Sequence, residues 1–195
     1  MNRMSGTYPT SPVFNSVGFN SVHYNLSSTS VSGRTQVRNI GGQRFEFSAT
    51  YPSLTRVEFA PVLAFIMAQR GMAETFTIVL PEISTKSGNA SGTVRTVGAD
   101  VVGETSIAID GLSGTLKAGD VIKFANHNKV YMIVSDRTGT GTLSIQPGLR
   151  EATANDTAIT YDNVPFTVRL SNDVQEYSLG LSSLVDYEVD FIEAI

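Results

Sequence analysis

The chain has 195 residues, a formal net charge of -4, no cysteine and only 16% charged residues. A chain with net negative charge is not expected to bind nucleic acid by neutralising its phosphates. A chain without cysteine has neither disulfides nor thiolate chemistry. Glycine is abundant and long helical patterns are few, which predicts a mainly β protein. The N-terminal sequence lacks the apolar run of a signal peptide, and no stretch reaches the roughly 18 consecutive apolar residues of a membrane span. We therefore expect no membrane insertion.

Residues 1–12 are polar and carry Pro9 and Pro12, which indicates a flexible or extended arm. Residues 31–40 and 43–50 then read as two strands. The Gly41-Gly42 pair between them predicts a two-residue hairpin turn, because glycine tolerates positive φ. In the second strand Phe45, Phe47 and Ala49 share one face by strand alternation.

A helix follows, and its start is ambiguous. Thr55 and Glu58 have the spacing of a capping box, which would begin the helix directly after Thr55. Pro61 favours a later start, because proline suits the first helical position and breaks a backbone bond further in. We expect the helix to start between residues 57 and 60, to be largely buried and to stop at Gly71.

The residue composition and the strand pattern of the chain change twice after the helix. An apolar strand at residues 75–80 is followed by a Gly/Ser/Thr-rich connector, and long alternating strands return at residues 166–170 and 187–195. Between them lies a series of short strands separated by turn signals, expected at residues 93–97, 105–109, 121–124, 129–135, 142–145 and 158–161. The pattern predicts one small β domain, residues 82–163, inserted into another that comprises residues 13–81 and 164–195.

The last strand carries a row of acids. Asp186, Glu188 and Asp190 are spaced by two and share one strand face, while Tyr187 and its alternating partners take the other face. Three interpretations stay open: an ordinary solvated face, a calcium site, or an electronegative wall that repels a polyanion. Calcium sites normally use looped ligands, which three acids on one strand do not provide.

No motif in the chain indicates a catalytic centre, a metal site or a cofactor. His23 and His127 have no ligand spacing and are interpreted as ordinary surface or turn residues. Residues 139–142, Gly-Thr-Gly-Thr, lie between two expected strands and fit a hairpin turn better than a phosphate loop, which needs a helix N-terminus. We therefore expect a protein that is not an enzyme and uses no cofactor.

Several stretches together resemble the distal tail proteins of tailed bacteriophages. The similar segments comprise the strand at residues 43–50, the helix with its aromatic start and glycine end at Phe65–Gly71, the Thr75-Phe76 strand ending at Pro81, and the closing strand at residues 187–195. Within the insert it comprises Gly119–Ile122, Lys129–Tyr131 and Ile145–Arg150. The resemblance covers roughly three quarters of the chain and carries no invariant chemistry.

The resemblance implies a structural protein of the virion tail, assembled in the host cytoplasm. Such proteins form a ring, usually six-fold, that continues the tail tube and joins it to the tip or baseplate. The outer domain would be a tail-tube-like β-barrel or sandwich with one flanking helix, and the insert a small barrel like the oligonucleotide/oligosaccharide-binding fold. The expected partners are copies of itself, the tail tube protein and tail hub or tip proteins. DNA would only pass through, along a channel faced by Asp186, Glu188 and Asp190.

A second function stays open. The insert could instead make the chain a carbohydrate- or receptor-binding module of a tail tip. Sugar sites favour exposed aromatic side chains and amides, and the chain contains no tryptophan, which weakens this alternative.

Overall fold

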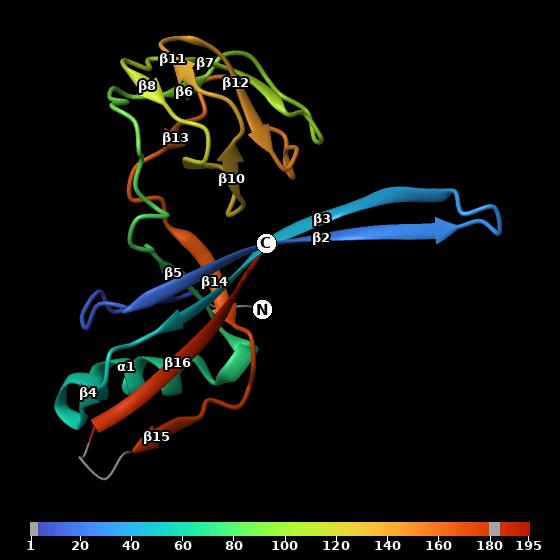
Figure 1. Cartoon of the computed structure of the whole chain (residues 1–195). Helices are drawn as coiled ribbons and strands as arrows, with labels where there is room; N and C mark the ends of the chain where they lie inside the picture. The colour runs from blue at the N-terminus through green and yellow to red at the C-terminus, as the bar shows by residue number, and fades with distance from the viewer. Residues whose placement is uncertain (1–3, 180–183) are drawn as a thin grey trace. The chain divides into compact units, whose positions relative to one another are not determined.

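A computed structural model describes residues 4–179 and 184–195 of the chain (Figure 1). The chain forms two compact units. The first comprises residues 9–75 and 169–193, together with the start of the chain, and the second comprises residues 6–8, 76–168 and 194–195. The division falls inside three strands, at residues 5/6, 75/76 and 168/169. The last two points lie a few residues away from the domain limits expected from the sequence, and those limits stay a prediction.

The larger sheet contains eight strands in the order β1-β5-β14-β16-β3-β2, with β4 and β15 also paired to β16. These strands are β1 (Met4–Thr7), β2 (Ser16–Thr29), β3 (Thr35–Thr50), β4 (Leu54–Thr55), β5 (Thr75–Ile78), β14 (Phe166–Leu170), β15 (Tyr177–Leu179) and β16 (Leu184–Glu193). Strand β16 is antiparallel to β3, with Phe191 opposite Phe47 and Val189 opposite Ala49. Their buried side chains build the core of this sheet, and the expected shared face of Phe45, Phe47 and Ala49 is confirmed.

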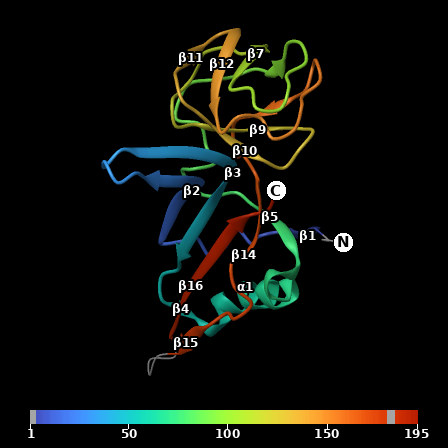
Figure 2. The same ribbon diagram turned by 90° about the vertical axis from the view of Figure 1, so that its right-hand side faces the viewer.

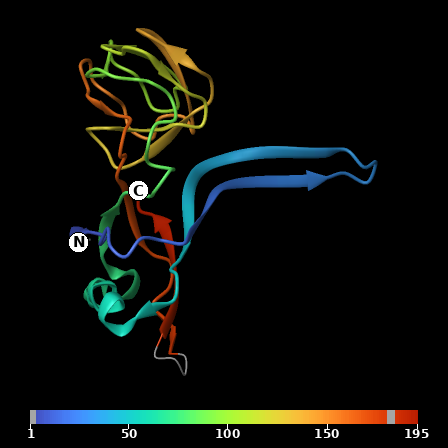
Figure 3. The same ribbon diagram turned by 60° about the vertical axis from the view of Figure 1, so that its left-hand side comes forward.

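Strands β2 and β3 form one long hairpin, which corrects the sequence prediction. The turn lies at residues 30–34, where the Ser30 amide donates to the Arg34 carbonyl, and Gly41-Gly42 lies inside β3. Both glycines have positive φ, 82° and 81°, and the register with β2 shifts beside them. They therefore act as a β-bulge, which inserts extra residues and bends a strand. Figure 3 shows the bend in the hairpin.

Helix α1 spans Arg56–Gln69, so it begins before the start expected from the sequence. The capping box decides its start: the Thr55 amide donates to Glu58 Oε2 at 2.9 Å, and the Glu58 amide donates to Thr55 Oγ1 at 3.4 Å. The Thr55 hydroxyl also donates to Glu58 Oε2, at 2.7 Å, and this bond, followed by that of the Thr55 amide, lowers the pKa of the Glu58 carboxyl. Pro61 therefore lies inside the helix, because the reciprocal cap outweighs the backbone bond that proline removes.

The helix ends as expected in left-handed backbone, at Arg70 (φ 55°) and Gly71 (φ 66°), which begins the short 3-10 helix η1 (Gly71–Ala73). A Cβ at Gly71 would lie 2.9 Å from the Asp173 Cα, so only glycine fits there.

Helix α1 is only half buried, which corrects the expectation that it is largely buried. Phe59, Val62 and Ile66 face the sheet and are at most 2% exposed. The opposite side is also apolar, with Val57 83% exposed, Met67 69% exposed and three alanines between or beside them. A helix that is apolar on all sides is normally covered on all sides, so this outer face has no partner within the described chain.

The N-terminal arm is extended where the structure describes it, from residue 4, and it contacts its own chain at Tyr8. The Tyr8 amide donates to the Thr77 carbonyl at 2.8 Å, and the Tyr8 ring stacks on Phe76 with centroids 5.8 Å apart. Tyr8 is 3% exposed. Burial of this ring fixes the end of the arm against β5.

The second unit contains a six-stranded sheet in the order β13-β9-β10-β12-β7-β6 and a separate pair, β8 and β11. Figure 2 shows these short strands curling around a common interior. They are β6 (Arg95–Thr96), β7 (Ser106–Asp110), β8 (Thr115–Leu116), β9 (Val121–Phe124), β10 (Val130–Ile133), β11 (Arg137–Thr138), β12 (Gly141–Gln146) and β13 (Ile159–Thr160). The six expected strands are confirmed in place. The two-residue strands β8 and β11 were missed, because so short a run shows no alternation.

The edges of this sheet meet, so it closes into a small barrel. Arg95 on β6 bridges Ala158 beside β13, and the Ile159 amide donates to the Val94 carbonyl at 2.9 Å. Closure removes the open edges that a sheet otherwise exposes. Fourteen buried residues, Ile107, Phe124 and Tyr131 among them, fill the interior. The predicted fold class, mainly β with one flanking helix and a small barrel, is confirmed, and the likeness of the barrel to the oligonucleotide/oligosaccharide-binding fold stays a prediction.

The two segments that lead into and out of the barrel are tied to each other. The Val164 amide donates to the Ser84 carbonyl at 2.9 Å, and the Leu80 amide donates to Ser84 Oγ at 2.8 Å. Two residues further along, Lys86 Nζ lies 2.8 Å from Asp162 Oδ2. The ends of residues 84–164 therefore lie within hydrogen-bonding distance of one another.

We predict that this adjacency lets a short linker replace the barrel. With residues 85–163 replaced by a short Gly/Ser linker, the rest of the chain is expected to fold, because loop-closure entropy grows only slowly with loop length. Far-ultraviolet circular dichroism and a cooperative urea transition check the result. An insoluble product, while the full chain is soluble, would count against the predicted inserted domain.

Candidate functional site

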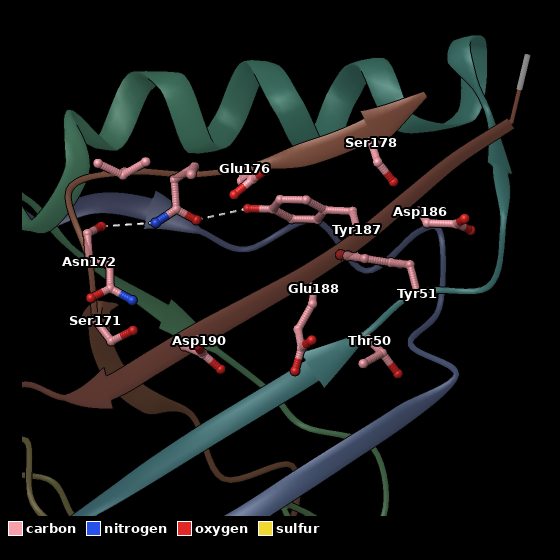
Figure 4. Close-up of a pocket in the computed structure, with 12 residues that line it drawn as sticks. Thr50, Tyr51, Ser171, Asn172, Glu176, Ser178, Asp186, Tyr187, Glu188 and Asp190 are labelled. Carbon is pink, nitrogen blue, oxygen red and sulfur yellow. Dashed lines mark hydrogen bonds between the residues drawn. The ribbon is translucent and has the colours of Figure 1, made fainter. Parts of the chain in front are cut away.

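A groove on the first unit brings the acidic row together with a neighbouring loop (Figure 4). Its volume is about 570 Å³, within the range of small-molecule sites. The lining residues come from the end of β3, from β15 and β16, and from the loop between β14 and β15: Thr50, Tyr51, Ser171, Asn172, Val174, Gln175, Glu176, Ser178, Asp186, Tyr187, Glu188 and Asp190. Four carboxylates line the groove, and among residues 4–179 and 184–195 no lysine, arginine or histidine does.

Strand alternation places the acids. Asp186, Glu188 and Asp190 are exposed, while Tyr187 and Val189 between them are buried, which confirms the shared face expected from the sequence. Strand β16 lies beside β3, so serine side chains reach two of the acids: Ser53 Oγ donates to Asp186 Oδ1 at 2.6 Å, and Ser48 Oγ donates to Glu188 Oε1 at 2.8 Å. These bonds orient the carboxylates and leave their charge unneutralised.

Tyr187 forms the floor of the groove, a role that its place in the alternation did not reveal. Its hydroxyl donates to Gln175 Oε1 at 2.9 Å, and the Gln175 amide nitrogen donates to the Asn172 carbonyl at 2.8 Å (Figure 4). The ring lies 5.0 Å from that of Phe59 on α1. Burial, with a smaller contribution from Tyr51 and then Asp190, raises the pKa of the Tyr187 hydroxyl. The hydroxyl therefore stays protonated and holds the β14–β15 loop against β16.

The acidic row does not assemble into a metal site. Among residues 4–179 and 184–195, no group of three or more histidine and acidic side chains is placed to hold a metal ion. The reason is spacing: side chains two apart on one strand are roughly 7 Å apart, too far to share one ion. Of the three sequence interpretations, the solvated face and the electronegative wall therefore remain, and the channel role of these acids stays a prediction.

The two histidines have different surroundings. His23 is exposed on the β2–β3 hairpin, as expected. His127 lies in the loop between β9 and β10, as expected of a turn residue, but it is only 7% exposed and so is not a surface residue. Its Nε2 lies 2.8 Å from the Tyr131 hydroxyl, and burial lowers the pKa of its imidazole. The contact fixes the loop between β9 and β10 from inside the barrel, a role that only tertiary packing could show.

The β2–β3 hairpin is the second notable surface, and sequence reasoning missed it because β2 was not predicted. Beyond the bulge, Leu26 is 62% exposed, Val37 64% and Ile40 59%. Strand β16 pairs with β3 only at residues 46–50, so among the described strands none covers the outer edge of residues 35–42. The signal that could have found β2 was the Val-x-Phe-x-x-Val pattern at residues 17–22.

The described chain has one α-helix, α1, and it is too short and not apolar enough to cross a membrane.

Two comparisons with known proteins agree with one another. Residues 84–164 match the family described as the B domain of distal tail protein pb9. Over 174 residues the chain is 24% identical to distal tail protein pb9 of Escherichia phage T5, an alignment that covers 84% of this chain and 84% of that protein. The resemblance stated from the sequence is thereby confirmed.

We predict that Tyr187→Phe lowers the free energy of unfolding by about 1 kcal/mol, because Gln175 loses its donor in a half-enclosed place. The raised pKa adds a pH dependence. The folded state keeps a proton that the unfolded state releases above pH about 10, so wild-type stability falls as pH rises beyond that value, and falls less steeply in Tyr187→Phe.

Urea unfolding at neutral and alkaline pH measures both effects. Tyr24→Phe is the matched control, since Tyr24 is 44% exposed and no hydrogen bond of its hydroxyl is recorded within the described chain. Equal stability of wild type and Tyr187→Phe at both pH values would contradict the assigned role.

Proposed function

We propose that this chain, which belongs to the distal tail proteins of tailed phages and is a structural component of the virion tail, forms a ring that joins the tail tube to the tail tip or baseplate. Six copies are expected from the family resemblance. The role is structural rather than enzymatic. Its partners are copies of itself, the tail tube protein and hub or tip proteins, and DNA passes through without specific binding.

The observation that carries this proposal is the projecting β2–β3 hairpin (Figures 1 and 3). An isolated two-stranded ribbon is marginally stable in water, and open strand edges favour pairing with another chain. Leu26, Val37 and Ile40 remain exposed on it without any cover from the described chain. A neighbouring subunit supplies the missing contacts.

The outer face of α1 supports self-association in a second way. Val57 and Met67 lie on an apolar helix face that is uncovered, and uncovered apolar patches of this kind mark interaction sites. The hairpin and the helix face are unlike surfaces on one unit. Contacts between unlike surfaces join copies head to tail, and such contacts close into rings when the rotation fits.

The alternative of a carbohydrate- or receptor-binding module has less support. A cavity of about 290 Å³ in the second unit is lined by Lys123, Asn126, His127 and Asn128, among others. Phe124, which also lines it, is fully buried, so the cavity lacks the exposed aromatic platform that sugar sites favour. Glycan binding by the full chain, lost in Asn126→Ala, would favour this alternative.

We predict that the protein assembles at tens of micromolar, either alone or when tail tube protein is added, and that Leu26→Ser with Ile40→Ser weakens assembly. Both side chains are already exposed, so the free energy of unfolding should change by no more than about 0.5 kcal/mol. Light scattering reports assembly, and negative-stain images show rings.

Val101→Ser with Val102→Ser is the matched control, because these valines are 61% and 63% exposed on the second unit. A wild-type protein that stays monomeric under both conditions would refute the ring.

A further inference from the structure

Residues 16–45 of the β2–β3 hairpin carry positive charge only. Arg34 lies next to its turn, Arg38 and Arg44 follow along β3, and no acidic residue occurs between the start of the chain and Glu46. Arg34 and Arg38 are exposed, and no ion pair of either side chain is recorded within the described chain. Arg44 lies over the Tyr24 ring, 6.0 Å from its centroid. The outer half of the hairpin is therefore a cationic ribbon with apolar side chains.

The groove on the same unit carries the opposite charge. Glu176, Asp186, Glu188 and Asp190 line it, and no cationic side chain among the described residues does. The groove also offers apolar contact, because Val174, which is 80% exposed, lines it together with Tyr187. Its chemistry is complementary to the hairpin in both respects.

We infer that the tip of the β2–β3 hairpin docks into the acidic groove of a second copy of this chain, with Arg34 and Arg38 facing the carboxylates. The contact is intermolecular because the hairpin projects from the far part of β3, while the groove lies at Thr50, at the other end of the same strand (Figures 1 and 3). About a dozen extended residues separate the two along β3.

Both surfaces belong to the same unit, so every copy carries one hairpin and one groove. A head-to-tail contact of this kind propagates from copy to copy and closes when the rotation fits. The groove volume of about 570 Å³ accommodates a few side chains, so the turn and its arginines enter it, while the apolar side chains of the hairpin lie on the rim. Arginine suits this role, because its planar fork binds carboxylates with two hydrogen bonds.

This inference rests on the proposed self-association and gives a second meaning to the acidic row. If Asp186, Glu188 and Asp190 bind the hairpin of a neighbour, they are covered in the ring and do not face a channel. The two roles make opposite predictions for the same variant, so one experiment separates them.

We predict that Arg34→Glu with Arg38→Glu, or Asp186→Lys with Glu188→Lys, raises the concentration of half-assembly about tenfold or more, because like charges then face each other. The combined four-substitution protein, with both signs reversed, restores assembly. Wild-type assembly also weakens as salt is raised, because exposed charge pairs are screened. Sedimentation velocity measures assembly, and circular dichroism checks that each variant is folded.

Arg150→Glu and Glu151→Lys are matched controls, since both are exposed on the second unit, and each is expected to assemble as wild type does. Asp186→Asn with Glu188→Gln removes charge without reversing it and is expected to weaken assembly less.

Reversed variants that assemble like wild type, or a combined variant that fails to recover, would overturn the docking while leaving the ring intact. Virions in which Asp186→Lys with Glu188→Lys assembles normally but releases DNA slowly would likewise overturn it in favour of the channel. A wild-type protein that never assembles would refute the proposed ring itself.

Discussion

The pairing of β16 with β3 is the constraint on which the first unit depends. Strand β16 has a neighbour on each side, so its register is fixed, and its side chains must alternate between the core and the solvent. Val189 and Phe191 therefore enter the core, and Glu188 and Asp190 face outward. A slip of one residue would turn the acids toward the core, where burying unpaired charges costs a large free energy, and no lysine or arginine is among the described buried residues of this unit. The packing of the core therefore determines which side chains of β16 line the groove.

The two units treat their exposed strand edges differently, because the barrel closes its sheet while the hairpin leaves an edge open. In the second unit, Arg95 bridges Ala158 and the sheet closes on itself, so it offers no strand edge to another chain. In the first unit, β3 continues past its pairing with β16 and carries β2 out into solvent. The longest strand edge left open among the described residues is thus on a bent, positively charged ribbon. Charge of one sign also opposes random pairing of hairpins with one another.

The matches to distal tail proteins cover most of the chain, yet the residues that carry the proposals here are ordinary ones. No nucleophile, metal cluster or cofactor motif contributes to them. Function in such a chain follows from where surfaces lie and from which charges they carry. Assembly and stability are therefore the properties that variants of these exposed side chains should change.

Strand periodicity is a local property, and it was enough to predict the alternation of β16, the shared face of Phe45 and Phe47, and six strands of the barrel. The sequence misplaced the hairpin turn, since Gly41-Gly42 suits a bulge as well as a turn, and only the pairing of β3 with the unpredicted β2 distinguishes them. It left the helix start open, because two local rules conflicted at Pro61 and the Thr55–Glu58 hydrogen bonds decided between them. The groove, the burial of His127 and the exposure of the hairpin were decided by tertiary structure alone, because each depends on segments that are distant in sequence and meet only in the folded chain.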